Sequence, residues 1–489
     1  MSALIIIFAV MGLALWLGIQ ARRGRDMTLE QWTVGGRGFG TALVFLLMAG
    51  EIYTTFTFLG GSGFAYGQGA PAYYILCYGS LAYIISYWLL PAIWRYAKAH
   101  NLISQPDFFV HKYDSPALGV LVALVGIIAL VPYLVLQLKG LGIIVETASY
   151  GAIGSSIAIW IGVVVVTCYV IVSGVRGSAW TAVIKDTLIL IVVVFLGVFM
   201  PIHYYGGLGP MFQAIDAAKP GFLALPPQGQ SISWFDSTVL LTALGFFAWP
   251  HTFASLYTAR DERTFRRNAI LLPLYQLILL FVFFVGFAAI LKVPGLKGPQ
   301  IDLSLLRLSA ATFPAWAVGI IGAAGVLTAL VPGSMILITA ATLLANNLYR
   351  VFRPGTDDAT VSLLAKLLVP AVALVGVYFT LRGGETIVAL LLMGYSFVTQ
   401  LFPALVCSLM ARNPVTREGA FAGIFAGVAT VALISLTHTT LGTLFPALPQ
   451  WARELNVGIV ALVVNIVVLA IVSAATQRAH QARRTLSSR

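Results

Sequence analysis

The stretch AGEIYTTFTFLGGSG, residues 49–63, decides the fold, because it places an acid and four glycines inside the long apolar segment 41–68. Glu51 lies about ten residues into that segment, which is roughly 15 Å of helix and brings it near the middle of a bilayer. A carboxylate at that depth is costly, so we expect it either to act in function or to hold a helix break. Together with the glycines, it predicts an interrupted membrane-spanning helix.

The rest of the chain is also strongly apolar. Of its 489 residues, 59% are hydrophobic and 9% are charged, against about 25% charged residues in soluble globular domains. Most apolar segments are long enough to cross a hydrocarbon core of about 30 Å. The sequence therefore predicts an all-α integral membrane protein with thirteen transmembrane helices, at residues 3–19, 41–68, 72–97, 117–147, 152–172, 178–203, 235–258, 268–291, 312–348, 361–380, 385–409, 418–436 and 455–475.

The basic residues gather on one side of these spans. Twenty-one of the 29 lysines and arginines lie in or beside the connections that follow odd-numbered spans or in the C-terminal tail, and six lie on the opposite side. Because basic residues favour the cytoplasmic side, we predict a multi-pass protein of the cytoplasmic (inner) membrane, with its N-terminus outside and its C-terminus in the cytoplasm. Topology thus explains the net charge of +12, which argues against a nucleic-acid partner.

Spans 2–6 and 7–11 form two sets of five. Since five is odd, the second set is inverted relative to the first, as in many secondary transporters. The second set also opens with an interrupted helix, ALGFFAWPHTF at 243–253. The predicted units are a first helix and cytoplasmic loop, a five-helix repeat, an extracellular loop, an inverted five-helix repeat, and two peripheral helices with a tail, at 1–40, 41–203, 204–234, 235–409 and 410–489.

Three motifs resemble the sodium:solute symporter family: SGVRGSAWTAVIKD at 173–186, WPHTFASLYTARDERTFRRNA at 249–269 and ATLLANNLY at 341–349. The motif ALVPGSM at 329–335 resembles the corresponding segment of the bacterial monocarboxylate permease branch, which moves lactate, pyruvate and related acids. The resemblance implies a LeuT-type 5+5 inverted-repeat fold and alternating access, with the substrate between spans 2 and 7.

Two departures from the family pattern concern the coupling ion. Val331 and Pro332 stand where sodium-coupled members carry a Ser-Thr pair, and Ala182 replaces an aspartate. We expect Pro332 to interrupt its helix and to free the Thr328 carbonyl. Because Glu51 offers a proton route, we favour H+ over Na+ as the coupling cation. The residues predicted for coupling are Gly50, Glu51, Tyr53, Thr328, Pro332 and Ser334.

Substrate contacts are predicted at both interruptions and on span 4. Hydroxyls beside an unwound backbone suit a carboxylate or a cation, although each can also bond back to its own helix. Tyr133 and Gln137 are four residues apart and share a helix face. His251 can share a proton or bind a carboxylate, or simply hold the kink. The predicted substrate-binding residues are Tyr53, Thr54, Thr55, Thr57, Tyr133, Gln137, Trp249 and His251.

Other polar residues within the apolar spans suggest local roles. Lys139 is expected to extend outward to the interface or to attract anionic substrates. Lys185 and Asp186 are expected to form an interfacial pair in the first turns of span 6. The three cysteines fall in apolar stretches, where we expect buried thiols, and their spacing predicts neither a disulfide framework nor a metal site.

These observations favour a secondary active symporter that imports a small monocarboxylate such as lactate, pyruvate, acetate or propionate. No cofactor is expected, and the partners are the substrate and the lipid bilayer, with no obligate protein partner. A sodium-coupled symporter of pantothenate, proline or another amino acid is an alternative, since Glu51 can supply the acidic contact that a zwitterion needs. A solute-sensing receptor and a passive channel are further alternatives. The sequence offers neither a nucleophile–base pair nor a metal cluster that would indicate an enzyme.

Overall fold

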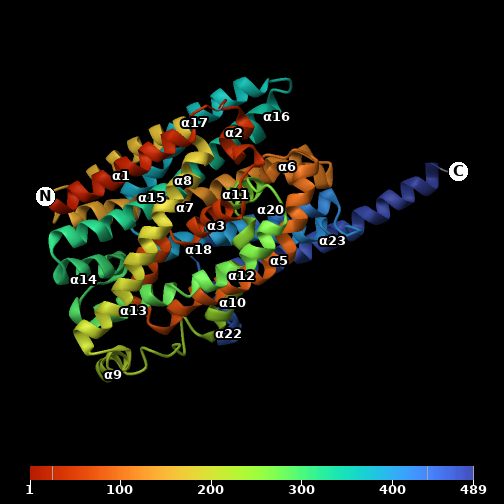
Figure 1. Ribbon diagram of the computed structural model, residues 1–489. Helices are drawn as coiled ribbons and strands as arrows, with labels where there is room; N and C mark the ends of the chain where they lie inside the picture. The colour runs from red at the N-terminus through yellow and green to blue at the C-terminus, as the bar shows by residue number, and fades with distance from the viewer. Residues whose placement is uncertain (25, 438, 488–489) are drawn as a thin grey trace.

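The computed structural model describes residues 1–24, 26–437 and 439–487 as an elongated bundle of helices (Figure 1). The N- and C-termini lie at opposite ends of the bundle. Within the described ranges no β-strand occurs, and one isolated bridge joins Phe39 to Ala259. The expectation of an all-α protein is confirmed.

Apart from the two broken spans described below, the helices that occupy the predicted apolar spans differ in length. They are α1 (Ser2–Ala21), α5 (Tyr74–Ala99), α7 (Pro116–Ala148), α8 (Ser155–Tyr205), α12 (Arg263–Gln276), α13 (Leu279–Lys292), α15 (Ala315–Thr342), α17 (Asp358–Arg382), α18 (Ile387–Val398), α19 (Phe402–Ser408), α20 (Arg417–Leu436) and α23 (Val457–Ser487). Shorter connecting helices are α2 (Leu29–Val34), α6 (Gln105–Tyr113), α9 (Leu208–Ala218), α14 (Ser304–Thr312), α16 (Arg350–Phe352), α21 (Leu441–Leu444) and α22 (Gln450–Arg453).

Two spans are broken where the sequence predicts it. Helix α3 (Thr41–Ile52) ends before Tyr53 (φ −83°, ψ 78°), and a π-helical stretch then leads into α4 (Ser62–Gln68) at a bend of 46°. Helix α10 (Ile232–Gly245) passes through a 3₁₀ turn to extended Trp249, and α11 (Pro250–Tyr257) continues at a bend of 48°. The prediction of two interrupted helices, in the stretches 49–63 and 243–253, is confirmed.

Helix α8 is 51 residues long and contains two of the predicted spans. It is not straight, because Gly174 has φ 55° and ψ −157° in its interior. Among the residues that the structure describes, ten helices are long and apolar enough to cross a membrane, or up to twelve when each bent pair counts as one span. The predicted number of thirteen, which divides α8 in two, stays a prediction.

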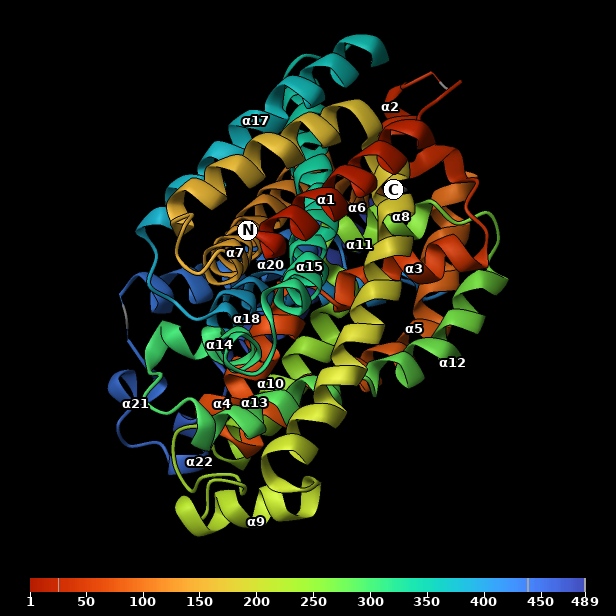
Figure 2. The same cartoon turned by 60° about the vertical axis from the view of Figure 1, so that its left-hand side comes forward.

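Helix α15 forms the core of the bundle and packs against α1, α7, α8 and α17. Figure 2 shows α15 behind α1, with α7 and α17 beside it. It remains helical from Ala315 to Thr342, with Pro332 in its interior. The expected interruption at Pro332 is therefore wrong: the proline removes one backbone donor, and the dense packing around the helix keeps its course.

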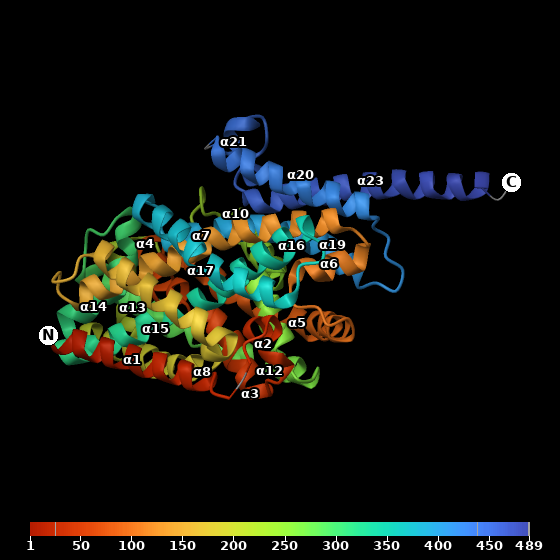
Figure 3. The same ribbon diagram turned by 90° about the horizontal axis from the view of Figure 1, so that it is seen from above.

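The last two long helices form a separate layer. Helices α20 and α23 pack along each other on one flank of the bundle, and α23 extends beyond it (Figure 3). Cys77 and Cys168 are exposed, and Cys407 is half-buried. The expectation of buried thiols is wrong, because apolar stretches in a membrane protein also supply the outer surface.

The kink at Gly174 yields a first prediction. Its backbone lies in a region that only glycine adopts readily, and a Cβ there would lie 2.7 Å from the Trp32 carbonyl oxygen. We expect Gly174→Ala to lower the free energy of unfolding by about 1–3 kcal/mol from backbone strain alone. Thermal unfolding of the purified protein measures this. Gly12→Ala is the control, since a Cβ at Gly12 meets nothing within 4 Å, and equal midpoints for the two variants would contradict the prediction.

Candidate functional site

The two broken helices meet at the side chain of Glu51. Its carboxylate oxygen Oε2 accepts a hydrogen bond from the Thr252 hydroxyl at 3.1 Å, and Oε1 accepts a short one from the Ser255 hydroxyl. Glu51 is at the end of α3 and both hydroxyls are on α11. All three side chains are buried. A single acid therefore links the two halves of the site.

One face of α7 lies against both breaks. The Tyr133 hydroxyl donates to the Glu51 carbonyl at 3.2 Å, and the Tyr133 ring centroid lies 5.0 Å from that of Trp249 and 5.2 Å from that of His251. One turn later, Gln137 Oε1 accepts from the Thr55 hydroxyl at 2.7 Å. The prediction that Tyr133 and Gln137 share a face is confirmed, and that face points to the site.

The contacts of Gln137 leave a hydrogen-bond donor without a partner. Oε1 also accepts from the Thr55 amide at 3.4 Å, and two donors on that atom fix the amide orientation. Within the described part of the chain, Gln137 Nε2 is buried and has no hydrogen-bond partner. Buried polar groups are nearly always paired, so the Gln137 amide can still donate to an acceptor that a bound ligand supplies.

Aromatic side chains enclose the second break. Trp249 lies 5.3 Å from Tyr395 and 5.6 Å from His251, measured between ring centroids. His251 is 2% exposed, and its Nδ1 also has no partner among the residues that the structure describes. The structure thus brings Trp249 and His251 together with Tyr133, as the sequence predicts for the substrate region.

The other predicted hydroxyls have partners within the protein. The Tyr53 hydroxyl donates to the Tyr275 carbonyl at 3.2 Å, away from α7. The Thr57 hydroxyl donates to the Thr54 carbonyl at 2.9 Å, and the Thr54 hydroxyl accepts from the Phe56 amide at 3.1 Å. Thr54 and Thr57 therefore stabilise the break itself, and their role toward a substrate stays a prediction.

A residue that we expected at the membrane interface lies at the centre of the site. Lys185 Nζ donates to the Gly50 carbonyl at 3.2 Å and to the Tyr53 carbonyl at 3.0 Å, and it forms an ion pair of 2.8 Å with Asp186. The Lys185 side chain is 0% exposed. The interfacial assignment of Lys185 and Asp186 is wrong, because α8 kinks at Gly174 and continues helical past it. That places Lys185 about 16 Å beyond the kink.

The predicted coupling residues of α15 hydrogen-bond within the protein. The Thr328 hydroxyl donates to the Gly325 carbonyl at 2.6 Å. The Ser334 hydroxyl donates to the Val331 carbonyl at 2.6 Å and also bonds the Ser178 hydroxyl at 2.6 Å. A part in ion coupling for Thr328, Pro332 and Ser334 stays a prediction.

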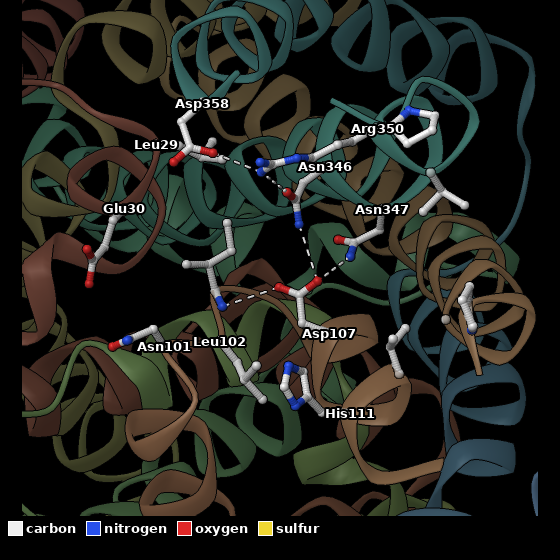
Figure 4. Close-up of a pocket in the computed structure, with 16 residues that line it drawn as sticks. Leu29, Glu30, Asn101, Leu102, Asp107, His111, Asn346, Asn347, Arg350 and Asp358 are labelled. Carbon is white, nitrogen blue, oxygen red and sulfur yellow. Dashed lines mark hydrogen bonds and ion pairs between the residues drawn. The ribbon is translucent and has the colours of Figure 1, made fainter. Parts of the chain in front are cut away.

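A depression of about 900 Å³ opens at the bundle end that carries α6 and α16 (Figure 4). On its wall, Asp107 accepts hydrogen bonds from the amide groups of Asn346 at 3.3 Å and Asn347 at 2.7 Å. Burial raises the pKa of the Asp107 carboxyl, and hydrogen bonds from Ser104, Asn347 and Ile103 oppose that shift. Asp107 thus fastens α6 to the end of the α15 span.

A smaller cavity lies between this depression and the second break. Its lining shares Ile103 with the depression and includes Pro250, the first residue of α11. The Gln105 amide, also on its lining, donates to the Ala248 carbonyl at 2.6 Å. Gln105 therefore fastens the start of α6 to the backbone just before the second break.

The opposite end of the bundle holds another lysine–aspartate pair. Lys139 Nζ lies 2.7 Å from Asp302 Oδ2 and donates to the Glu385 carbonyl at 2.7 Å. Burial raises the pKa of the Asp302 carboxyl, and Lys139 acts to lower it. Lys139 therefore extends to the connections at this end of the bundle and pairs with an acid there, and a role toward anionic substrates stays a prediction. In the described ranges, no group of three or more His, Cys, Asp or Glu residues could hold a metal ion.

Two broken helices joined by a buried acid, inside a bundle of apolar helices, define a membrane transporter. The chain belongs to the sodium:solute symporter family, whose model matches residues 32–427.

Relatives agree with this assignment over almost the whole chain. The chain is 67% identical over 481 residues to "Uncharacterized symporter YhjB" of Bacillus subtilis (strain 168), covering 98% of each chain. It is 30% identical over 407 residues to the "Monocarboxylate transport permease protein" of Rhizobium johnstonii, covering 82% of this chain and 81% of that one. A solved structure of a substrate-bound, outward-open Na+-coupled sialic acid symporter superposes with a TM-score of 0.79 at 16% identity, covering 97% and 98% of the two chains. The LeuT-type fold is thereby confirmed.

The link between the broken helices yields a second prediction. Glu51→Leu leaves the buried hydroxyls of Thr252 and Ser255 without their acceptor, and each costs about 1–3 kcal/mol of unfolding free energy. Glu51→Gln keeps an oxygen acceptor and an amide that can donate, so we expect a smaller loss. Thermal unfolding of both purified variants compares them, and equal loss in both would show that the two hydroxyls do not depend on Glu51.

Proposed function

We propose that the protein is a secondary active transporter that imports a small monocarboxylate such as lactate, pyruvate, acetate or propionate, driven by protons. The observation that carries the proposal is the unpaired Gln137 amide, which is buried beside the α3 break and can only donate. A carboxylate is an acceptor with two oxygens and matches such a donor. The likeness to a monocarboxylate permease supports the same substrate class.

The second break supplies further donors for an anion. Helix α11 begins at Pro250, so its first turn points free N–H groups and the positive end of its dipole toward the site. Unwound half-helices of this kind bind anionic substrate groups in other transporters. The aromatic rings of Tyr133, Trp249 and Tyr395 then offer apolar surface to a short alkyl chain.

An amino-acid substrate fits this arrangement less well. Its ammonium group needs an acidic contact, and Glu51 is the acid beside the break. Both Glu51 oxygens already accept hydrogen bonds from α11 hydroxyls. A zwitterion would share these oxygens with the two hydroxyls, whereas a monocarboxylate needs no contact with them.

Proton coupling rests on Glu51. Its carboxyl group lies within the membrane-spanning bundle and connects the two helices that carry the site. A carboxyl group can bind a proton on one side of the membrane and release it on the other. Protonation changes its hydrogen bonds to Thr252 and Ser255, since one oxygen becomes a donor. We further propose that the membrane is the cytoplasmic one, with the N-terminus outside, as the basic residues predict.

The substrate proposal predicts a competition pattern. In proteoliposomes, unlabelled lactate, pyruvate or propionate should reduce uptake of a labelled monocarboxylate, while glucose and sialic acid should not, because the site lacks a polar cluster large enough for a sugar. Gln137→Leu should raise KM at least about tenfold, the cost of a lost hydrogen bond to a charged group. Competition by sialic acid without competition by short acids would exclude the substrate class.

Phe379→Leu is a matched control for the Gln137 variant. Phe379 is an exposed apolar side chain on α17. An unchanged KM in this variant shows that the reconstituted protein is intact. If Gln137→Leu also kept the wild-type KM, the amide would have no contact with the carboxylate.

The coupling proposal predicts a separate result. Glu51→Gln should abolish accumulation driven by a pH gradient but preserve exchange of labelled for unlabelled substrate, because exchange moves no net proton. At fixed pH, replacing sodium by choline should leave wild-type uptake unchanged. Normal accumulation by Glu51→Gln would make the residue structural, and saturable restoration of uptake by sodium would assign the driving ion to sodium.

A further inference from the structure

The α3 break contains an ammonium group that is held by two backbone carbonyls and paired with a carboxylate. Lys185 Nζ carries three N–H donors, and it has three oxygen partners: the carbonyls of Gly50 and Tyr53 and the carboxylate of Asp186. The Lys185 side chain is 0% exposed and that of Asp186 3% exposed. Backbone carbonyls are the groups with which proteins replace the hydration shell of a bound cation. Here two carbonyls exposed by a helix break face the buried ammonium group of Lys185.

The surroundings leave no room for a second cation at these carbonyls. A Cβ at Gly50 would lie 3.3 Å from Lys185 Nζ and 3.8 Å from Val331 Cγ1, so the ammonium and the valine close the space beside Gly50. On α15, the side chains of Val331 and Pro332 offer no oxygen. The nearby Ser334 hydroxyl is bonded to Val331 and Ser178. The residues present therefore do not fit a sodium ion, which the family name implies.

We propose that Lys185 is a built-in cation, whose ammonium group fills the position at the α3 break that a transported alkali cation would occupy. The proposal deepens the proposed proton coupling and is independent of the proposed substrate. Lys185 stabilises the break permanently, and Glu51 remains the group that gains and loses a proton.

The charged groups around Lys185 support this division of roles between Lys185 and Glu51. Asp186 on the same helix neutralises the ammonium, Glu51 approaches it from α3, and the phenols of Tyr53 and Tyr275 face the pair from the α3 break and from α12. Among these groups, Glu51 alone bonds to the α11 hydroxyls. Lys185 thus contacts one broken helix, whereas Glu51 connects both.

Thermal unfolding of the full-length purified protein tests the proposal without any substrate. At equal ionic strength and pH, the wild-type midpoint should be the same in sodium chloride and in choline chloride. Lys185→Ala should have a lower midpoint, which sodium or methylammonium raises in a saturable way, because the vacated space keeps two carbonyls and a carboxylate. Uptake by this variant should be lost without an added cation.

Lys139→Ala is the matched control, because Lys139 also pairs with an aspartate and donates to a backbone carbonyl. Its midpoint should not respond to sodium. Saturable sodium stabilisation of the wild type, an equal sodium response in Lys139→Ala, or a wild-type midpoint and uptake in Lys185→Ala would each overturn the proposal.

A double variant covers the case in which Lys185→Ala does not fold. Lys185→Met with Asp186→Asn removes both charges and leaves no buried carboxylate unpaired. We expect it to fold, to show no cation response and to have lost uptake, and wild-type uptake would overturn the proposal. If monocarboxylates were not transported, the proposed function would fail, while the wild-type unfolding result would still stand.

Discussion

A helix that stops inside a membrane must find new partners for its backbone, because lipid offers no hydrogen bonds. At the α3 break, the carbonyls of Gly50 and Tyr53 accept from Lys185, and that of Glu51 accepts from Tyr133. The backbone amides are satisfied as well. Those of Thr54, Thr55 and Phe56 donate to the side chains of Thr57, Gln137 and Thr54, respectively. Helices α7 and α8 are therefore bound to this break, and the site is assembled by the same contacts that make the break stable.

The sequence was sufficient for the parts of the fold that depend on local pattern. Apolar segments of membrane length located the long helices, and glycines or a proline within such segments located both breaks. The shared face of Tyr133 and Gln137 followed from helical spacing alone. By contrast, Pro332 suggested a third break that the structure lacks, because neighbours on all sides hold α15 helical.

The central position of Lys185 could not be obtained from spacing. Gly174 bends the chain without ending the helix, so counting from an assumed helix start put the lysine near the surface. The pairing of Glu51 with Thr252 and Ser255 was also invisible, since these residues are about 200 positions apart. One signal was available: a lysine and an aspartate inside an apolar stretch are costly, and need partners that only the tertiary structure provides.

A cation that is covalently attached to the protein cannot carry energy across the membrane, because it never leaves its site. If Lys185 holds the α3 break, the driving ion must bind to another group, and that group must influence both broken helices. Glu51 meets this requirement, since its backbone belongs to the break that Lys185 stabilises and its carboxylate accepts from α11. Protonation replaces one acceptor oxygen by a donor and so changes the contact between the two helices. A fixed lysine on α8 and a titrating glutamate at the end of α3 would thus separate the two roles that a bound sodium ion performs together.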